Sequence, residues 1–265
     1  MNYGVYHGCH NSFVIGQDKV GIDYSKEAKK QCEIYKTDGF IIFKDNPIEM
    51  LYYNSDGSRA PMCGNGVRCF IKYGYDLGLL PSPNFTVKTL SGDVEVQITK
   101  TTPFTVKANL GKPNFSTHLL GIDTKAEEFI NQEINVLGKI ITCSAIFMNT
   151  HHLVIFVHEF DDLLNLANNI HEHPIFKDKI NVNFVIVDGK NKLRIKTFER
   201  GVGWTKACGT GAASAFAVSY RLGFVGEEAE VTSAGGTLHI TSANDDVIME
   251  GPVVTIKEPV YESRS

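Results

Sequence analysis

The sequence has no long apolar run, no low-complexity tract and no glycine- or serine-rich linker. No hydrophobic stretch approaches the roughly 18–20 residues that a membrane-spanning helix needs. Lysine and arginine (26) do not outnumber aspartate and glutamate (30), so no basic surface for nucleic acid is indicated. The first residues lack the basic start and apolar stretch of a signal peptide. We therefore expect a cytoplasmic protein that binds neither nucleic acid nor a membrane.

The cysteines follow no common zinc-binding pattern. Cys63 and Cys69 are separated by five residues, whereas zinc sites use spacings of roughly two to four. In a reducing compartment we expect all the cysteines to be free thiols. A cysteine is by default a small buried apolar residue, so a functional role has to be argued for each position. The other cysteines are Cys9, Cys32, Cys143 and Cys208.

Short β-rich segments alternate with a few helical ones, which predicts a mixed α/β (α+β) fold. Helices are expected over residues 27–35 and 161–169 and over the segments that follow Cys63 and Cys208. The second of these segments is rich in alanine, which suits a helix in a central position wrapped by strands. Strands are expected in the apolar, β-favouring runs at 13–15, 40–43, 153–157 and 184–187.

An internal repeat with an offset of 145 residues is the most informative feature. Cys-Gly-Asn-Gly at 63–66 corresponds to Cys-Gly-Thr-Gly at 208–211. A Leu-Gly pair follows 14 residues after each cysteine and predicts the end of a helix. After each pair we expect one strand with an internal glycine, over 85–96 and 230–241. This repeated order predicts two similar lobes with a boundary near residues 110–122.

Each copy of the repeat places a cysteine and Gly-x-Gly at the start of a helix. The first helical turn has unpaired N–H groups and a partial positive charge. A thiolate there is stabilised, so its pKa falls from about 8.5 toward neutrality, and the amides can hold a carboxylate. Inverting an α-carbon requires one acid/base group on each face. Cys63 and Cys208 can supply this pair without pyridoxal phosphate or a metal.

Three parts of the sequence resemble the diaminopimelate epimerase family of cofactor-independent amino-acid epimerases and racemases. The resemblance runs through nearly the whole chain. The matching segments are His-Gly-Cys-His-Asn-Ser-Phe at 7–13, Asn-Ser-Asp-Gly-Ser at 54–58 with Met-Cys-Gly-Asn-Gly-Val-Arg-Cys at 62–69, and Glu-Arg-Gly-Val-Gly at 199–203 with Ala-Cys-Gly-Thr-Gly at 207–211.

The resemblance implies two pseudo-symmetric α/β lobes, each a curled, mainly antiparallel sheet around a central helix, with the active site between the lobes. Residues 1–115 are expected to form the N-terminal lobe, completed by a C-terminal strand within 250–265. Residues 116–249 are expected to form the other lobe. The implied partner is a small amino-acid substrate, and a homodimer is compatible with the resemblance.

The resemblance also implies roles for individual residues. Cys63 and Cys208 match the two acid/base cysteines. Glu199 and His151 match the residues that assist the thiols and hold the reacting amino group. The polar set around the substrate, with Arg200 on the distal carboxylate, is Asn11, Asn54, Asn149, Asn181 and Arg200. The backbone amides around the α-carboxylate are those of Gly64, Asn65, Gly209 and Thr210.

Several positions depart from the family pattern. Residues 34–39 keep only the Asp-Gly end of a glycine-rich stretch, and His10 replaces a glycine. Thr150 replaces a proline before His151 and is followed by His152. Trp204 stands where an acidic residue is common. The roles of His10, His152 and Trp204 are left open, and so is the substrate.

Three functions are therefore compatible with the sequence. The retained arginine and asparagine set favours epimerisation of LL-diaminopimelate to the meso form. The departures favour racemisation of another amino acid, such as histidine. A thiol-based metal-binding or redox protein would use Cys63, Cys69, Cys208 and His151, but the ligand spacing does not favour it. A proline racemase relative shares Cys-Gly-Thr-Gly, but the first motif and the chain length fit it less well.

Overall fold

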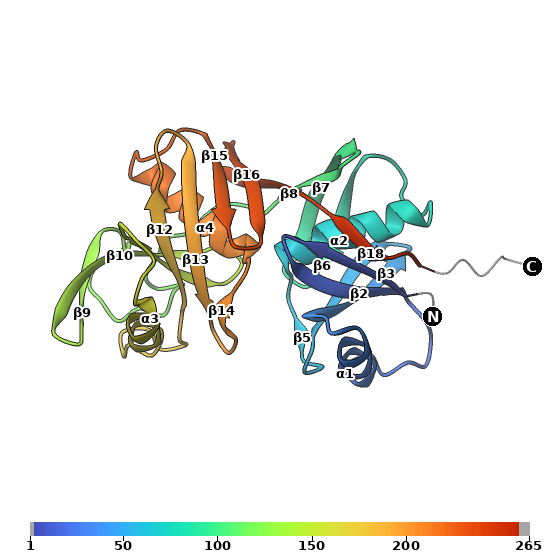
Figure 1. Cartoon of the computed structure of the whole chain (residues 1–265), viewed down its shortest axis with the longest axis horizontal. Coiled ribbons are helices and arrows are strands. Elements are labelled where there is room, and N and C mark those ends of the chain that lie inside the picture. The colour runs from blue at the N-terminus through green and yellow to red at the C-terminus, as the bar shows by residue number, and fades with distance from the viewer. Residues whose placement is uncertain (1–2, 260–265) are drawn as a thin grey trace, which may run out of the picture. The chain divides into compact units, whose positions relative to one another are not determined.

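The computed structural model describes residues 3–259 and divides the chain into two compact units (Figure 1). The first unit contains the residues up to Asn109 and those from Glu250 onward, and the second unit contains Leu110–Met249. Residues 260–265, the end of the predicted C-terminal strand segment, lie outside the described residues. No helix in the described part of the chain is both long and apolar enough to cross a membrane.

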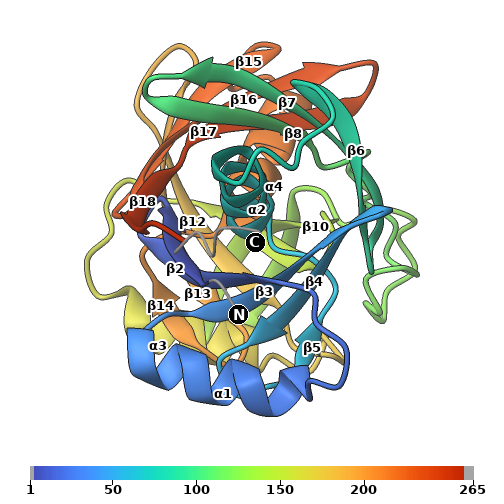
Figure 2. The ribbon, with the colours of Figure 1, turned by 90° about the vertical axis from the view of Figure 1, so that its right-hand side faces the viewer.

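The first unit is a sheet folded around helix α2 (Figure 2). Strands that follow each other without an intervening helix pair antiparallel. The two parallel pairs are β2–β3, whose connection contains α1, and β4–β6, whose connection contains α2. Strand β18 pairs antiparallel with β1. The elements are β1 (Gly4–Gly8), β2 (Asn11–Gln17), α1 (Tyr24–Tyr35), β3 (Gly39–Asp45), β4 (Ile48–Asn54), β5 (Arg59–Ala60), α2 (Gly64–Asp76), β6 (Asn84–Thr89), β7 (Gly92–Thr101), β8 (Phe104–Asn109) and β18 (Val254–Lys257).

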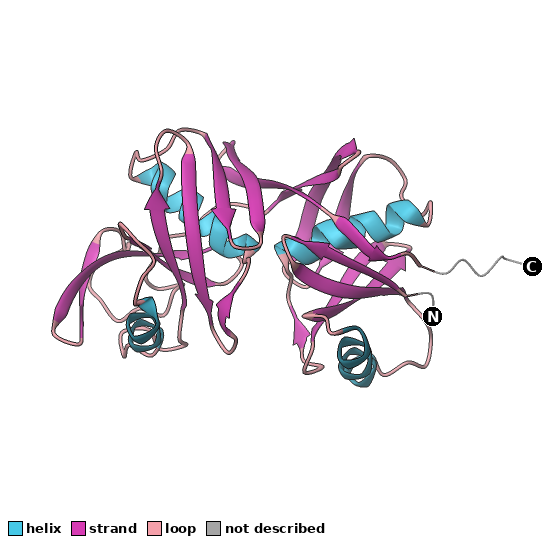
Figure 3. Ribbon diagram, in the orientation of Figure 1, coloured by secondary structure: helices cyan, strands magenta, loops and turns pink. Residues whose placement is uncertain are grey.

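The second unit is built in the same way around helix α4 (Figure 3). Its parallel pairs are β11–β12, across α3, and β13–β15, across α4. Strand β9 pairs antiparallel with β10, as β18 does with β1. The elements are β9 (Gln132–Val136), β10 (Lys139–Phe147), β11 (His151–Phe156), α3 (Leu163–His171), β12 (Asn181–Val187), β13 (Lys192–Glu199), β14 (Gly203–Thr205), α4 (Gly209–Arg221), β15 (Glu228–Ser233), β16 (Gly236–Ala243) and β17 (Asp246–Pro252), of which residues 246–249 belong to this unit.

Apart from β9, which begins the second unit, and β18, which the first unit takes from the end of the chain, both units follow one order of elements: two strands, a helix, three strands, a helix and three strands. Helices α2 and α4 have 13 residues each, and each begins directly after a cysteine. Both end at a leucine followed by a glycine with positive φ, 66° at Gly78 and 76° at Gly223. The predicted α/β fold with two similar lobes is therefore confirmed.

Side chains of strand β3 point alternately toward α2 and toward α1, so the sheet packs against a helix on each face. Ile41 and Phe43 belong to the core that surrounds α2, whereas Phe40 and Ile42 pack with Ala28 of α1 on the other face. Successive side chains of a strand point to opposite faces, so an unbroken apolar run is what a strand between two helices requires. In Figure 2, α1 accordingly lies outside the sheet that encloses α2.

The prediction of one glycine-containing strand over 85–96, and of another over 230–241, was wrong. Each segment instead covers most of a hairpin, β6–β7 and β15–β16. The glycines begin the returning strands with φ of 109° at Gly92 and 139° at Gly236. Positive φ is easily reached only by glycine, so the internal glycine marks the end of a turn.

Candidate active site

Cys63 is the N-cap residue of α2, with an extended backbone (φ −134°, ψ 121°). Its Sγ donates a hydrogen bond to Asn11 Oδ1 at 3.5 Å. Asn65 Nδ2, from the first turn of α2, donates to the same oxygen at 3.4 Å. The thiol is partly exposed, whereas Gly64 and Asn65 are buried. Four predicted site residues therefore lie together at this helix start.

The β1–β2 hairpin and Asp38, the residue directly before β3, hold Asn11 in place. Cys9 and His10 form the turn with φ of 54° and 61°, the conformation that matches the twist of a tight hairpin. Asn11 Nδ2 donates to Asp38 Oδ2 at 3.1 Å. Ser12 donates to the same oxygen from its backbone N, at 2.7 Å, and from its Oγ, at 3.1 Å. His10 therefore shapes the turn that presents Asn11.

Asn54 is the last residue of β4, where the chain enters a turn. Its Nδ2 donates to Ser58 Oγ at 2.9 Å, and its carbonyl accepts from Gly57 N at 2.9 Å. Ser58 is held in turn by Asp56 Oδ1, which accepts from the Ser58 N and Oγ. These hydrogen bonds give Asn54 a local structural role in the turn.

Cys208 is the N-cap residue of α4, and its backbone (φ −128°, ψ 113°) matches that of Cys63. The side chain is buried, with 8% of its surface exposed. Its Sγ accepts from Gly211 N at 3.4 Å and lies 3.5 Å from Thr210 Oγ1. Gly209 and Thr210 occupy the first positions of α4, as Gly64 and Asn65 do in α2. Amides at these positions have no partner within a helix.

A network centred on Asn181 links His151 to Arg200. Asn181 Nδ2 donates to the His151 carbonyl at 3.0 Å, and its Oδ1 accepts from Arg200 N at 2.8 Å. The exposed Arg200 side chain donates from Nη1 to the Asp178 carbonyl at 2.9 Å. Partial burial, together with the positive charge of Arg200, lowers the pKa of His151 below its usual value. The His151 ring is therefore neutral near pH 7.

Glu199 and Asn149 are placed by other partners. Glu199 Oε1 accepts from Thr205 Oγ1 at 2.6 Å across the β13–β14 pair. Asn149 (φ 59°) donates from Nδ2 to the Leu110 carbonyl at 3.1 Å. Asn149 therefore ties the start of β11 to the segment that follows β8.

Trp204 and His152 have structural positions that the sequence did not indicate. Trp204 packs edge-on against Phe198, with ring centroids 5.4 Å apart, and Lys196 Nζ lies 4.6 Å from its ring centroid. His152 is fully buried and lies 3.0 Å from Thr210 Oγ1 through Nε2. Sequence reasoning also missed Asp38, although the retained Asp-Gly pair at 38–39 was a usable signal.

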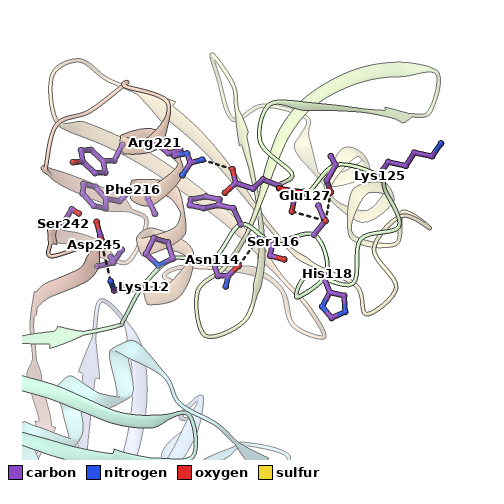
Figure 4. Close-up of a pocket in the computed structure, with 18 residues that line it drawn as sticks. Lys112, Asn114, Ser116, His118, Lys125, Glu127, Phe216, Arg221, Ser242 and Asp245 are labelled. Carbon is purple, nitrogen blue, oxygen red and sulfur yellow. Dashed lines mark hydrogen bonds and ion pairs between the residues drawn. The ribbon is translucent and has the colours of Figure 1, made fainter.

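The cavity drawn in Figure 4 lies elsewhere in the second unit. It has a volume of about 900 Å³ and follows the C-terminal half of α4. Arg221 pairs with Glu128 at 2.7 Å beside it, and Lys112 pairs with Asp245 at 3.4 Å. None of the residues predicted for the site lines this cavity. Within residues 3–259, no three His, Cys, Asp or Glu side chains are grouped as metal ligands.

The family model of diaminopimelate epimerase matches residues 3–116 and 144–256. The chain belongs to the diaminopimelate epimerase family. A diaminopimelate epimerase from Alkaliphilus metalliredigens is 35% identical, covering 96% of this chain and 95% of that protein. Another, from Caldanaerobacter subterraneus, is 32% identical and covers 94% of both.

The fold of this diaminopimelate epimerase family member is shared with solved structures of low sequence identity. A PhzF-family phenazine biosynthesis protein from Bacillus anthracis has a TM-score of 0.70 over 97% of both chains, at 17% identity. The predicted family and enzyme class, an isomerase of the epimerase type, are confirmed. The roles of individual residues stay predictions.

Proposed function

We propose that the protein converts LL-diaminopimelate to the meso form by proton transfer between the substrate and two cysteines, Cys63 and Cys208. One observation carries this proposal. Both cysteines are N-cap residues with the same backbone conformation, each at the start of the buried central helix of its unit. Two equivalent acid/base groups are what inversion of one α-carbon requires, because a single base cannot serve both faces.

The reaction needs only proton transfers. One cysteine, as a thiolate, takes the α-proton, so the C–H bond breaks and an S–H bond forms. The other cysteine, as a thiol, gives its proton to the opposite face of the α-carbon and becomes the thiolate. The α-carboxylate gains negative charge between these steps. The first-turn amides of Gly64, Asn65, Gly209 and Thr210 are suited to stabilise that charge.

Two further groups are assigned to the substrate's α-amino group. A neutral His151 ring has a nitrogen lone pair that can accept a hydrogen bond from an ammonium group. The Glu199 carboxylate, oriented by Thr205, provides a negative charge for the same group. Asn181 holds the backbones of His151 and Arg200 at a fixed separation, so we assign it a positioning role. Asn149 and Asn54 support the surrounding turns.

Arg200 is assigned to the distal carboxylate, which makes diaminopimelate the favoured substrate. A guanidinium group presents a planar set of N–H donors that fits a carboxylate. A monocarboxylic amino acid would offer no second carboxylate to this group, which would keep only its contact with the Asp178 carbonyl. We further infer a cytoplasmic location, which is supported by six cysteines that are all free thiols. A homodimer stays a prediction.

The deciding experiment follows α-proton exchange in D₂O by NMR with LL-diaminopimelate and, separately, with L-histidine and the other common L-amino acids. We expect rapid exchange and formation of the meso isomer with diaminopimelate alone. If diaminopimelate were inert while histidine exchanged, the substrate would be wrong and the two-cysteine chemistry would remain. Absence of exchange with every amino acid would contradict the proposed function as a whole.

A further inference from the structure

Behind Cys208, four buried polar side chains form a hydrogen-bonded chain that ends at its sulfur. His152 and Asn183 have no exposed surface, and Thr197 and Thr210 are 3% and 8% exposed. Burying a polar group destabilises the folded protein unless the group forms hydrogen bonds there. The order of contacts is Thr197, Asn183, His152, Thr210 and Cys208.

The orientation of Asn183 is fixed by its neighbours. Its Nδ2 lies 3.0 Å from the Leu153 carbonyl, which can only accept, so this atom must be the amide nitrogen. Its Oδ1 accepts from Thr197 Oγ1 at 3.0 Å. The second hydrogen of Nδ2 is then left for His152 Nδ1, 3.1 Å away. His152 Nδ1 is therefore an acceptor and carries no proton.

The proton of the His152 ring must consequently be on Nε2. Burial is the main cause that lowers the pKa of His152, to about 3, and the nearby His151 and Arg200 act in the same direction, so the ring is neutral and has one N–H. The two side chains at hydrogen-bonding distance from the ring nitrogens, Asn183 of β12 and Thr210 of α4, are uncharged. His152 Nε2 donates this hydrogen to Thr210 Oγ1 at 3.0 Å.

The Thr210 hydroxyl lies between the His152 ring and the Cys208 sulfur and contacts both. One lone pair of Oγ1 is occupied by the His152 N–H, and the hydroxyl hydrogen remains available for Cys208 Sγ at 3.5 Å. The Thr210 carbonyl accepts from Ser214 Oγ at 2.8 Å, which anchors this turn of α4. Gly211 N is a second donor to Sγ, at 3.4 Å. Donors to a sulfur favour its charged form.

We propose that His152, acting through the Thr210 hydroxyl, keeps a hydrogen-bond donor directed at Cys208 and thereby favours its thiolate form. His152 is a positioning residue, because both ring nitrogens are occupied and the neutral ring carries no proton to the substrate. The proposal rests on the proposed function in one respect, the use of Cys208 as an acid/base group. It adds a residue that the family resemblance does not assign.

The surroundings of Gly211 show how closely the chain of polar groups packs on the helix start. A Cβ atom there would lie 2.5 Å from Asn183 Oδ1 and 3.2 Å from Thr197 Oγ1. The equivalent position in the first unit, Gly66, instead faces Ile41 Cδ1 at 3.1 Å and Phe13 Cζ at 3.5 Å. Apolar atoms thus occupy, near Cys63, the place that the polar chain has near Cys208. Cys63 can therefore serve as an internal control when the reactivity of Cys208 is measured.

The test measures the pH dependence of iodoacetamide alkylation at Cys208 and at Cys63 in the substrate-free full-length protein, with each site quantified by peptide mass spectrometry. In His152→Leu and in Thr210→Val we expect the midpoint of Cys208 alkylation to rise by about one pH unit. A shift of this size corresponds to the loss of one hydrogen bond to a charged group. The Cys63 midpoint should stay unchanged in both variants.

His152→Gln is the matched variant, because its amide can donate to Thr210 and accept from Asn183. We expect its Cys208 midpoint to stay close to that of the wild type. Thr210→Val keeps the side-chain shape, so it decides the question if His152→Leu does not fold. An unchanged Cys208 midpoint in folded Thr210→Val, or equal shifts at both cysteines, would overturn the proposal. Exchange of the substrate α-proton is measured separately, so its absence would refute only the proposed function.

Discussion

The Oδ1 of Asn11 accepts a hydrogen bond from the thiol of Cys63 at 3.5 Å, across 52 residues of sequence. The direction of this hydrogen bond is determined, because Asn11 Nδ2 donates to the Asp38 carboxylate and so its oxygen must face the sulfur. An acceptor favours the protonated sulfur, whereas Cys208 has donors directed at it. The two cysteines, alike in backbone, therefore differ in their hydrogen-bonding environments.

Replacing either cysteine of the proposed pair should abolish inversion. Cys63→Ala and Cys208→Ala each remove the proton carrier for one face of the α-carbon. The serine variants should keep little activity, because a hydroxyl is a poor acid/base group at neutral pH. The measurement is formation of meso-diaminopimelate from the LL isomer. Cys143→Ala is the control, since burial raises the pKa of that thiol to about 12 and takes it out of proton transfer. Full activity in Cys63→Ala would contradict the mechanism.

Asp38→Asn should reduce activity by weakening the support of Asn11. The carboxylate accepts from the Asn11 side chain and from Ser12, and the amide would lose these charge-assisted bonds. Because Asp38 is exposed, we expect kcat/KM to fall only by roughly two- to tenfold. Asp23→Asn is the matched control, because Asp23 caps α1 by accepting from Lys26 N. Equal losses in the two variants would show that the effect is not specific to Asn11.

Arg200→Lys should raise KM for diaminopimelate by roughly ten- to a hundredfold, with a smaller change in kcat. An ammonium group lacks the planar pair of donors that a distal carboxylate needs. The backbone contact between Arg200 N and Asn181 is retained in this variant, so the surrounding turn should not change. Arg194→Lys, at an exposed ion pair with Asp188, is the control and should behave as the wild type. A KM that is unchanged in Arg200→Lys would remove Arg200 from the substrate site.

His152 should make the protein less stable as the pH falls. The folded-state pKa of about 3 lies below the value of about 6.5 expected in the unfolded chain. Between these values the unfolded state binds the additional proton, so the free energy of unfolding rises with pH. His152→Gln has no titratable group there and should lose this part of the pH dependence. Urea unfolding at pH 4, 5 and 7 measures it, with His239→Gln as a control at a partly exposed histidine.

If His152→Gln and the wild type lost stability in parallel between pH 7 and pH 4, His152 would not be buried as a neutral ring. The same outcome would remove the argument that its single proton is fixed on Nε2. This measurement requires no substrate, so it is independent of the activity assays above.

Local sequence was sufficient to identify the two helix starts. The cysteine before Gly-x-Gly and the Leu-Gly pair 14 residues later act within one helix, through its capping residues and a glycine of positive φ. Their repetition at one offset was enough to predict two lobes with similar helices. The interpretation of the glycine at position 92 was wrong, because a glycine between two apolar segments fits a bulged strand and a hairpin turn equally well.

Tertiary structure alone decided which polar side chains meet these helix starts. His151 and His152 are adjacent in β11 and therefore point to opposite faces, but the sequence does not say which face meets α4. The pairing of β11 with β12 and the packing of α4 bring His152, and not His151, to Thr210, 58 residues away. Asp38 and Asn11, 27 residues apart, likewise meet only because β2 and β3 are neighbours in the sheet. Contacts of this kind depend on strand register, which is a property of the folded sheet and not of any single segment.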